Sequence, residues 1–229
     1  MNYSRNRWYF RDMLKIVSFI LILGAAIFAL ELKDLEPVGF FLCALGVGLF
    51  LLAQCLTPND KQYDESVKEN LRDLKSRALK KLGIDEDEIS EVQPITFGGY
   101  DYQGADKRKE GKDKKWRSNV YKAVMIFFSQ NEMHCYTLRF KTTEQEQVEE
   151  TDVFFYQDIV SASTTSNTET ITVGKKQKTV NIEAFKLTTK GGNAIIVNLL
   201  NAADAQKSVN AMRALLREAR LSSQMQQAN

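Results

Sequence analysis

Two uncharged apolar segments near the amino terminus constrain this chain more than any other feature. Residues 16–30 (IVSFILILGAAIFAL) and 38–56 (VGFFLCALGVGLFLLAQCL) contain no charged side chain. A helix that crosses a bilayer needs about 20 mostly apolar residues, within a range of about 17–25. The second segment meets this length by itself, and the first meets it if Lys15 and Glu31 lie at the interfaces. We therefore expect a two-helix transmembrane hairpin within residues 1–57.

A cleaved signal peptide is the alternative interpretation of the first segment. Basic residues precede this segment, and the small residues Ala26 and Ala29 lie near its end, as at a cleavage site. A second apolar segment follows after only a few residues, which favours the hairpin.

Basic side chains flank the expected hairpin asymmetrically. The outer flanks are basic, whereas the connection between the two segments has Lys33 as its one basic residue. The flanking residues are Arg5, Arg7, Arg11 and Lys15 on one side, and Lys61, Lys68, Arg72, Lys75 and Arg77 on the other. Because Lys and Arg accumulate on the cytoplasmic side, we expect two spans in the cell (inner) membrane and both termini in the cytoplasm. The aromatic residues Trp8, Tyr9 and Phe10 are expected to anchor the chain at the interface.

Neither apolar segment contains an ionisable side chain, the usual mark of an ion or proton pathway in a membrane. We therefore do not expect a transporter. Small residues four positions apart let helices approach closely. Such pairs are Ala25 and Ala29, Gly39 and Cys43, and Ala44 and Gly48. They support packing within the hairpin and oligomerisation equally.

A connecting region, residues 58–90, follows the hairpin. Its apolar residues recur at spacings of three and four and predict one amphipathic helix over about residues 62–82; they are Val67, Leu71, Leu74, Ala78 and Leu82. The stripe could serve as a coiled-coil seam or pack on the following domain, and its short length favours packing. Gly83 is expected to end this helix, and a short acidic helix is expected at residues 86–90.

From residue 91 the apolar pattern becomes typical of strands. The expected strands cover residues 92–97, 120–129, 132–141, 152–164, 169–174, 179–189 and 193–199, with Gly191-Gly192 as a hairpin turn. A helix over about residues 202–220 follows, and its apolar face comprises Ala205, Val209, Met212, Leu216 and Ala219. These elements predict an α+β domain over residues 91–220, a small antiparallel barrel of about seven strands closed by the helix. The polar tail, residues 221–229, is expected to fray.

This order of elements resembles the pleckstrin-homology superfold in its bacterial PH-like and GRAM-like versions. The resemblance lies in residues 154–161 (FFYQDIVS), 185–192 (FKLTTKGG) and 210–217 (NAMRALLR). It implies a binding or scaffolding module without catalysis, often tethered to membrane helices, and it does not fix a ligand.

A basic segment, residues 106–117 (DKRKEGKDKKWR), separates the first two expected strands. Its candidate lipid-binding residues are Lys107, Arg108, Lys109, Lys112, Lys114, Lys115, Trp116 and Arg117. Near an anionic leaflet each basic residue contributes about 1 kcal/mol, and Trp116 could insert among the headgroups. A solvated, disordered loop is the alternative. Nucleic acid is not an expected partner, because aromatic residues are not interleaved with the charges.

No pattern of catalytic residues stands out in the chain. Its one histidine, His134, is adjacent to Cys135, and neighbours on a strand point to opposite faces. Cys43, Cys55 and Cys135 form neither a disulfide framework nor a zinc motif. We therefore expect no enzyme, metal or cofactor. The leading hypothesis is a membrane-anchored PH-like scaffold that docks a protein partner or anionic lipid. The alternative is a structural subunit of an oligomeric membrane complex, assembled through its transmembrane and linker helices.

Overall fold

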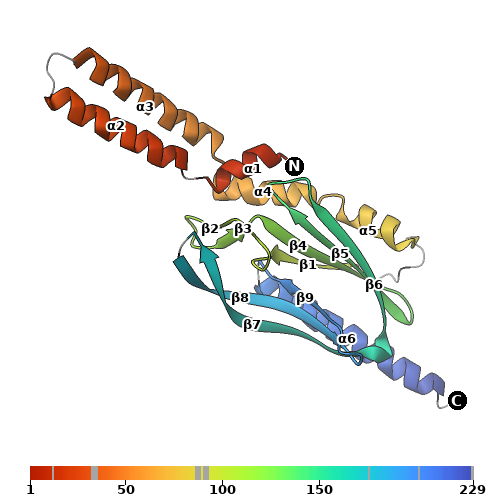
Figure 1. The fold of residues 1–229 in the computed structure, drawn as a ribbon. Helices are drawn as coiled ribbons and strands as arrows, with labels where there is room; N and C mark the ends of the chain where they lie inside the picture. The colour runs from red at the N-terminus through yellow and green to blue at the C-terminus, as the bar shows by residue number, and fades with distance from the viewer. Residues whose placement is uncertain are drawn as a thin grey trace. The chain divides into compact units, whose positions relative to one another are not determined.

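The computed structural model describes residues 1–11, 13–31, 36–85, 89, 93–174, 176–200 and 202–227. They form two compact units, Met1–Glu69 and Asn70–Asn229. Figure 1 shows a helical first unit and an α+β second unit. The expected acidic helix at residues 86–90 falls almost entirely outside the described residues.

The first unit contains α1 (Tyr3–Tyr9), α2 (Met13–Glu31), α3 (Glu36–Leu56) and α4 (Asp60–Asn70). Helices α2 and α3 run side by side (Figure 1). Gly46 of α3 permits this contact, because a Cβ there would lie only 2.8 Å from Ile22 Cγ1. The Cys43 thiol lies 3.9 Å from the carbonyl oxygen of Ile22.

Among the described residues, one window within 38–82 is long and apolar enough to cross a membrane. The window falls in α3, because charged residues begin at Asp60. The described apolar part of α2, Ile16–Ala26, is shorter than a span requires. The expected pair of spanning helices is thus found in part, with α3 alone meeting the criterion.

Helix α1 docks on α4 through aromatic rings. Tyr9 stacks on Tyr63 with 4.3 Å between ring centroids, and Phe10 packs edge-on against both. The Tyr9 hydroxyl donates a hydrogen bond of 2.7 Å to Asp60 Oδ1. Tyr9 therefore does not reach a lipid interface as expected, since it is buried within the protein. Trp8 remains partly exposed.

The expected single helix over residues 62–82 is wrong, because a turn at residues 71–73 divides it into α4 and α5 (Leu74–Leu82). The stripe is divided with it: Val67 is buried on α4, and Leu74 and Ala78 are buried on α5. Gly83 ends α5 as expected, with a left-handed φ of 69°.

The strands of the second unit form three antiparallel sheets. The first has the order β1-β4-β5-β6, the second is the pair β2-β3, and the third has the order β7-β8-β9. Their bounds are β1 (Ile95–Tyr100), β2 (Arg108–Glu110), β3 (Trp116–Ser118), β4 (Val120–Phe128), β5 (Glu132–Lys141), β6 (Gln147–Phe155), β7 (Ile159–Val173), β8 (Lys176–Thr189) and β9 (Ala194–Asn198). A short 3-10 helix, η3 (Tyr156–Asp158), links β6 to β7.

Two of the expected strands differ from the structure. One strand was expected over residues 152–164, but β6 begins earlier, at Gln147, and η3 separates it from β7. Strand β7 runs unbroken from Ile159 to Val173, although residues 165–168 (TSNT) read as a break. Both segments are largely exposed, so they lack the apolar alternation that identifies a half-buried strand.

The core lies between the first sheet, the third sheet and α6 (Ala202–Gln227). Phe97 of β1 stacks on Phe185 of β8 with 4.0 Å between ring centroids. The predicted apolar face of α6 is confirmed where it is described, through Ala205, Val209, Met212 and Leu216. The helix continues to Gln227, so most of the tail expected to fray is helical.

The expected closed barrel does not form. The first and third sheets meet at β1 and β9 through two hydrogen bonds, from Leu200 N to Gly98 O (3.2 Å) and from Asn198 Nδ2 to Tyr100 O (2.9 Å). No ladder joins β6 to β7 in the described chain, and η3 bridges that corner. Gly99 permits the β1–β9 approach, because a Cβ there would overlap the backbone of Asn198.

The substitution Gly99→Ala should separate β1 from β9 and destabilise the second unit by about 1–3 kcal/mol, the usual cost of overpacking. Hydrogen exchange at β1 and β9, measured on the full chain in detergent, should accelerate. Gly191→Ala is the matched control, since its Cβ would meet nothing closer than Thr189 Oγ1 at 4.0 Å. Equal exchange in both variants would contradict a role for Gly99.

Candidate functional site

The basic segment is an ordered hairpin and not the disordered loop considered as an alternative. Strands β2 and β3 pair in register, with Lys109 opposite Arg117. The turn is closed by hydrogen bonds from Gly111 N to Lys115 O (2.9 Å) and from Lys114 N to Gly111 O (3.1 Å). Lys114 occupies a left-handed conformation, with φ of 63°.

An internal ion pair stabilises this turn. The Arg117 guanidinium donates to both carboxylate oxygens of Asp113, at 2.9 and 2.8 Å, and its side chain is 3% exposed. The Lys115 backbone N–H also donates to Asp113 Oδ1 (3.1 Å). The hydrogen bonds from Arg117 lower the pKa of Asp113 from 3.8 to about 2. Arg117 is therefore committed to the hairpin and does not face an external ligand.

Two further basic residues are also committed within the protein. Arg108 donates to Tyr102 O (2.6 Å) and to Thr172 O (3.2 Å), which ties the hairpin to β7. Lys107 Nζ lies 2.9 Å from Asp106 and 3.7 Å from Glu144. Burial opposes the charge of Asp106, but hydrogen bonds from Lys107 and Asn119 outweigh burial and lower its pKa.

Trp116 packs against the protein and is only partly exposed. It lies with Tyr102 against a small apolar cluster of β7 and β8 residues that comprises Ile171, Val180 and Ile182. The Tyr102 hydroxyl donates to Trp116 O (2.9 Å). Through these contacts Trp116 joins the β2–β3 hairpin to the β7–β8 hairpin. Its ring is therefore engaged within the protein and is not directed outward for insertion among headgroups.

The exposed charge of the hairpin is concentrated in its turn. Lys112, Lys114 and Lys115 are exposed, and Lys109 is half-buried. The β7–β8 turn lies at the same end of the second unit (Figure 1), and it adds exposed Lys176 and Lys178. We call the five exposed lysines the lysine surface.

The two β8 lysines were missed by sequence reasoning. The sequence carries a signal for them, because residues 174–178 read GKKQK, a glycine followed by three lysines within four residues. In the structure Gly174 has a positive φ of 62°. The β7–β8 turn can be assigned to the same surface only once the contacts of β7 and β8 with the β2–β3 hairpin are known.

The candidate helix-packing residues fall into two groups. Ala25 and Gly39 are buried and Cys43 is half-buried, consistent with packing between α2 and α3. Ala44 and Gly48 are exposed, and a Cβ on Gly48 would meet nothing within 4 Å. On the connecting helices Val67 and Leu74 are buried and Leu71 is half-buried, while the side chain of Ala29 lies outside the described part.

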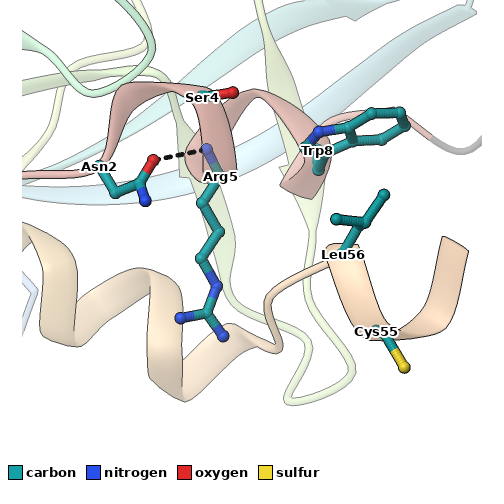
Figure 2. A pocket seen from close by; sticks show the side chains of 6 residues that line it. All are labelled: Asn2, Ser4, Arg5, Trp8, Cys55 and Leu56. Carbon is teal, nitrogen blue, oxygen red and sulfur yellow. Dashed lines mark hydrogen bonds between the residues drawn. The ribbon is translucent and has the colours of Figure 1, made fainter. Parts of the chain in front are cut away.

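A surface pocket of about 260 Å³ lies between α1 and the carboxyl end of α3. Its lining residues are Asn2, Ser4, Arg5, Trp8, Cys55 and Leu56. Figure 2 shows the Trp8 ring above Leu56, while the Arg5 side chain extends away from them. Arg5 donates to Gln62 Oε1 (3.2 Å). The pocket combines cationic, polar and apolar side chains, and no acid–base pair lines it.

No group of three or more His, Cys, Asp or Glu residues that could hold a metal ion occurs in the described part of the chain. Burial raises the pKa of the Cys135 thiol far above its usual range, which keeps it protonated. His134 is near Glu132, with 3.4 Å between Nε2 and Oε1, and is not paired with Cys135.

In comparisons with known proteins, no family model matches this chain, and no curated protein matches it.

The Asp113–Arg117 pair should make the hairpin sensitive to acid. A carboxyl whose pKa is lowered on folding contributes stability above its unfolded pKa and loses it as pH falls through the folded pKa. The hairpin should therefore weaken as pH falls from about 4 towards about 2, the pKa of Asp113. Trp116 fluorescence in a Trp8→Phe variant, which has a single tryptophan, measures this change. Asp113→Asn should remove this part of the pH dependence. If the variant shows the same fluorescence change with pH as the Trp8→Phe protein, the Asp113–Arg117 pair is not its cause.

Proposed function

We propose that this chain is a membrane-anchored, non-enzymatic binding module whose lysine surface contacts anionic lipid headgroups. The observation that carries this proposal is the separation of two kinds of cation at one end of the second unit. Arg108, Arg117 and Lys107 hold the structure together, whereas the lysines on the two turns are exposed. Ordered turns hold these charges in place, so less conformational entropy is lost on binding.

Lysine suits an interfacial role of this kind. Its ammonium is a compact, hydrated charge on a flexible stem, so it can reach headgroups without a fixed geometry. Five lysines near an anionic surface would contribute about 1 kcal/mol each, screened within about 8–10 Å at moderate salt. Because apolar helices already tether the chain, this attraction would orient the second unit more than recruit it.

Membrane anchoring through two spans at the inner membrane, with both termini cytoplasmic, is part of the proposal. The length and composition of α3 support it, as do the large exposed apolar side chains on both α2 and α3, which include Phe19, Ile20, Phe40 and Phe41. Arg5 and Trp8 lie beside the carboxyl end of α3, where interfacial residues are expected.

The PH-like resemblance is part of the same proposal. A four-stranded sheet, a three-stranded sheet and a carboxyl-terminal helix packed on their shared core agree with the order that the resemblance implies. Superfolds of this kind host many functions, so the lipid contact is argued from the lysines and not from the fold.

The test compares the full chain in nanodiscs of phosphatidylcholine with nanodiscs that also contain phosphatidylglycerol. Hydrogen exchange should slow at residues 109–116 and 174–178 in the anionic discs. The protection should disappear in the variant K112Q/K114Q/K115Q, and also in 1 M salt, where the Debye length falls to about 3 Å.

The matched control is K68Q/K80Q/K207Q, which removes the same charge from exposed positions on α4, α5 and α6. It should keep the protection, because these lysines lie outside the two turns. Equal exchange of the wild-type protein in neutral and anionic discs would refute the lipid contact.

Oligomerisation through the helices is the second candidate function. Ala44 and Gly48 remain exposed on α3 after α2 has packed, so they leave room for another helix. Gly48→Leu should then reduce cross-linking of the full chain in native membranes, and Gly24→Leu on α2, also in open space, is the control. Recovery of monomer alone from the wild-type protein would exclude this function.

A further inference from the structure

Strand β6 leaves a hydrogen-bonding edge open. It ends the sheet order β1-β4-β5-β6 and pairs only with β5 among the described residues. Figure 1 shows it at the outer side of that sheet. An edge strand with unpaired N–H and C=O groups is a template for another strand unless something blocks it.

The register shows which backbone groups of β6 point outward. Lys141 N donates to Glu146 O, and Tyr156 N donates to Asn131 O, both in the β5–β6 register. Hydrogen-bonded residues alternate along an antiparallel strand, so the even-numbered residues of β6 bond to β5. The odd-numbered residues, from 147 to 155, therefore direct their N–H and C=O groups away from the sheet.

The side chains of β6 differ between its two faces. Glu149 faces α5 and pairs with Arg77 at 2.8 Å, so its charge is neutralised. Val153 and Phe155 share this face and are 50% and 51% exposed. On the opposite face Glu150 and Asp152 are exposed and make no ion pair within the described chain. The open edge therefore has two exposed acidic side chains on one face, near exposed Val148, and two exposed apolar side chains on the other.

We propose that β6 binds an extended segment of a different protein by strand addition, and that this segment alternates basic and apolar residues. Its backbone would pair with the outward groups of β6. Its basic side chains would lie beside Glu150 and Asp152, and its apolar side chains beside Val153 and Phe155. In strand addition the main chain supplies the hydrogen bonds and alternate side chains supply the specificity.

Charge distinguishes this occupant from a second copy of the chain. Two copies of β6 paired about Thr151 would place Glu150 of each opposite Asp152 of the other, and like charges directly opposite are destabilising. The basic side chains of a cationic segment would instead form favourable opposite-charge pairs with Glu150 and Asp152. The surface is separate from the lysine surface, so this interaction does not depend on the proposed lipid contact.

The test uses the full chain in detergent and a synthetic peptide of alternating Lys and Val. This peptide should bind and slow hydrogen exchange across residues 149–153. The same peptide with N-methyl groups on the edge that faces β6 should not bind, because strand addition needs those N–H groups. A peptide of alternating Glu and Val should not bind either.

Variants of β6 test the same contact from the protein side. Thr151→Pro removes one outward N–H and leaves the β5–β6 ladder intact, as edge strands tolerate. It should weaken peptide binding about tenfold, the order expected for a lost hydrogen bond in such a ladder. Thr151→Val keeps the N–H and is the control. Glu150→Gln with Asp152→Asn should weaken binding of the Lys peptide.

Several outcomes would overturn the proposal. They are no protection at β6, equal binding of the N-methylated peptide, or a dimer that protects β6 without peptide. If Thr151→Pro fails to fold, the N-methylated peptide still tests strand addition, because it is measured with the wild-type protein. The variant K112Q/K114Q/K115Q should bind the peptide as the wild-type protein does, which separates this result from the lipid test.

Discussion

Burial of both faces of the central strands β4 and β5 is the constraint on which the second unit depends. On β4, Val124 and Ile126 face the shared core, and Ala123 and Phe127 face the other side; all four are 0% exposed. The first face is covered by the third sheet and α6, and α5 packs on β4 and β5. Strands β4 and β5, buried on both sides, cannot present a ligand site on their faces, so recognition is left to the exposed edge strand β6 and to the turns beyond the sheet.

The position of the charges follows from this arrangement. The planar, forked donors of the arginines bind groups of the protein itself. Arg117 binds the Asp113 carboxylate within the β2–β3 hairpin, and Arg108 binds backbone carbonyls outside it. The lysine surface lies on the two turns, where its side chains are exposed. The count of seven basic residues in the basic segment therefore overstated the positive charge available to a ligand. The β7–β8 turn adds two further exposed lysines.

The sequence predicted best where one face of an element is buried. The strands expected at residues 120–129 and 132–141 and the apolar face of α6 agree closely with the structure. Prediction failed at β6 and in the middle of β7, whose residues are mostly exposed, since such strands carry no apolar alternation. The prediction of a single helix failed at residues 71–73, because the apolar residues keep a helical spacing across a turn in the chain. Exposed lysines lie in the basic segment that the sequence singled out, but which of its cations are exposed could not be deduced from the sequence.

The sequence by itself determined the apolar helices, the α+β class and the presence of a basic segment, because each depends on local composition and periodicity. The tertiary structure decided that the barrel stays open, that Arg117 turns inward to Asp113, that a second lysine turn joins the first, and that β6 has a free edge. The Arg117–Asp113 pair joins residues four apart in sequence, whereas the other features depend on contacts between residues far apart in the chain. Local pattern does not encode such contacts, because the free energy of an open edge or of a join between sheets depends on which neighbours the fold brings to it.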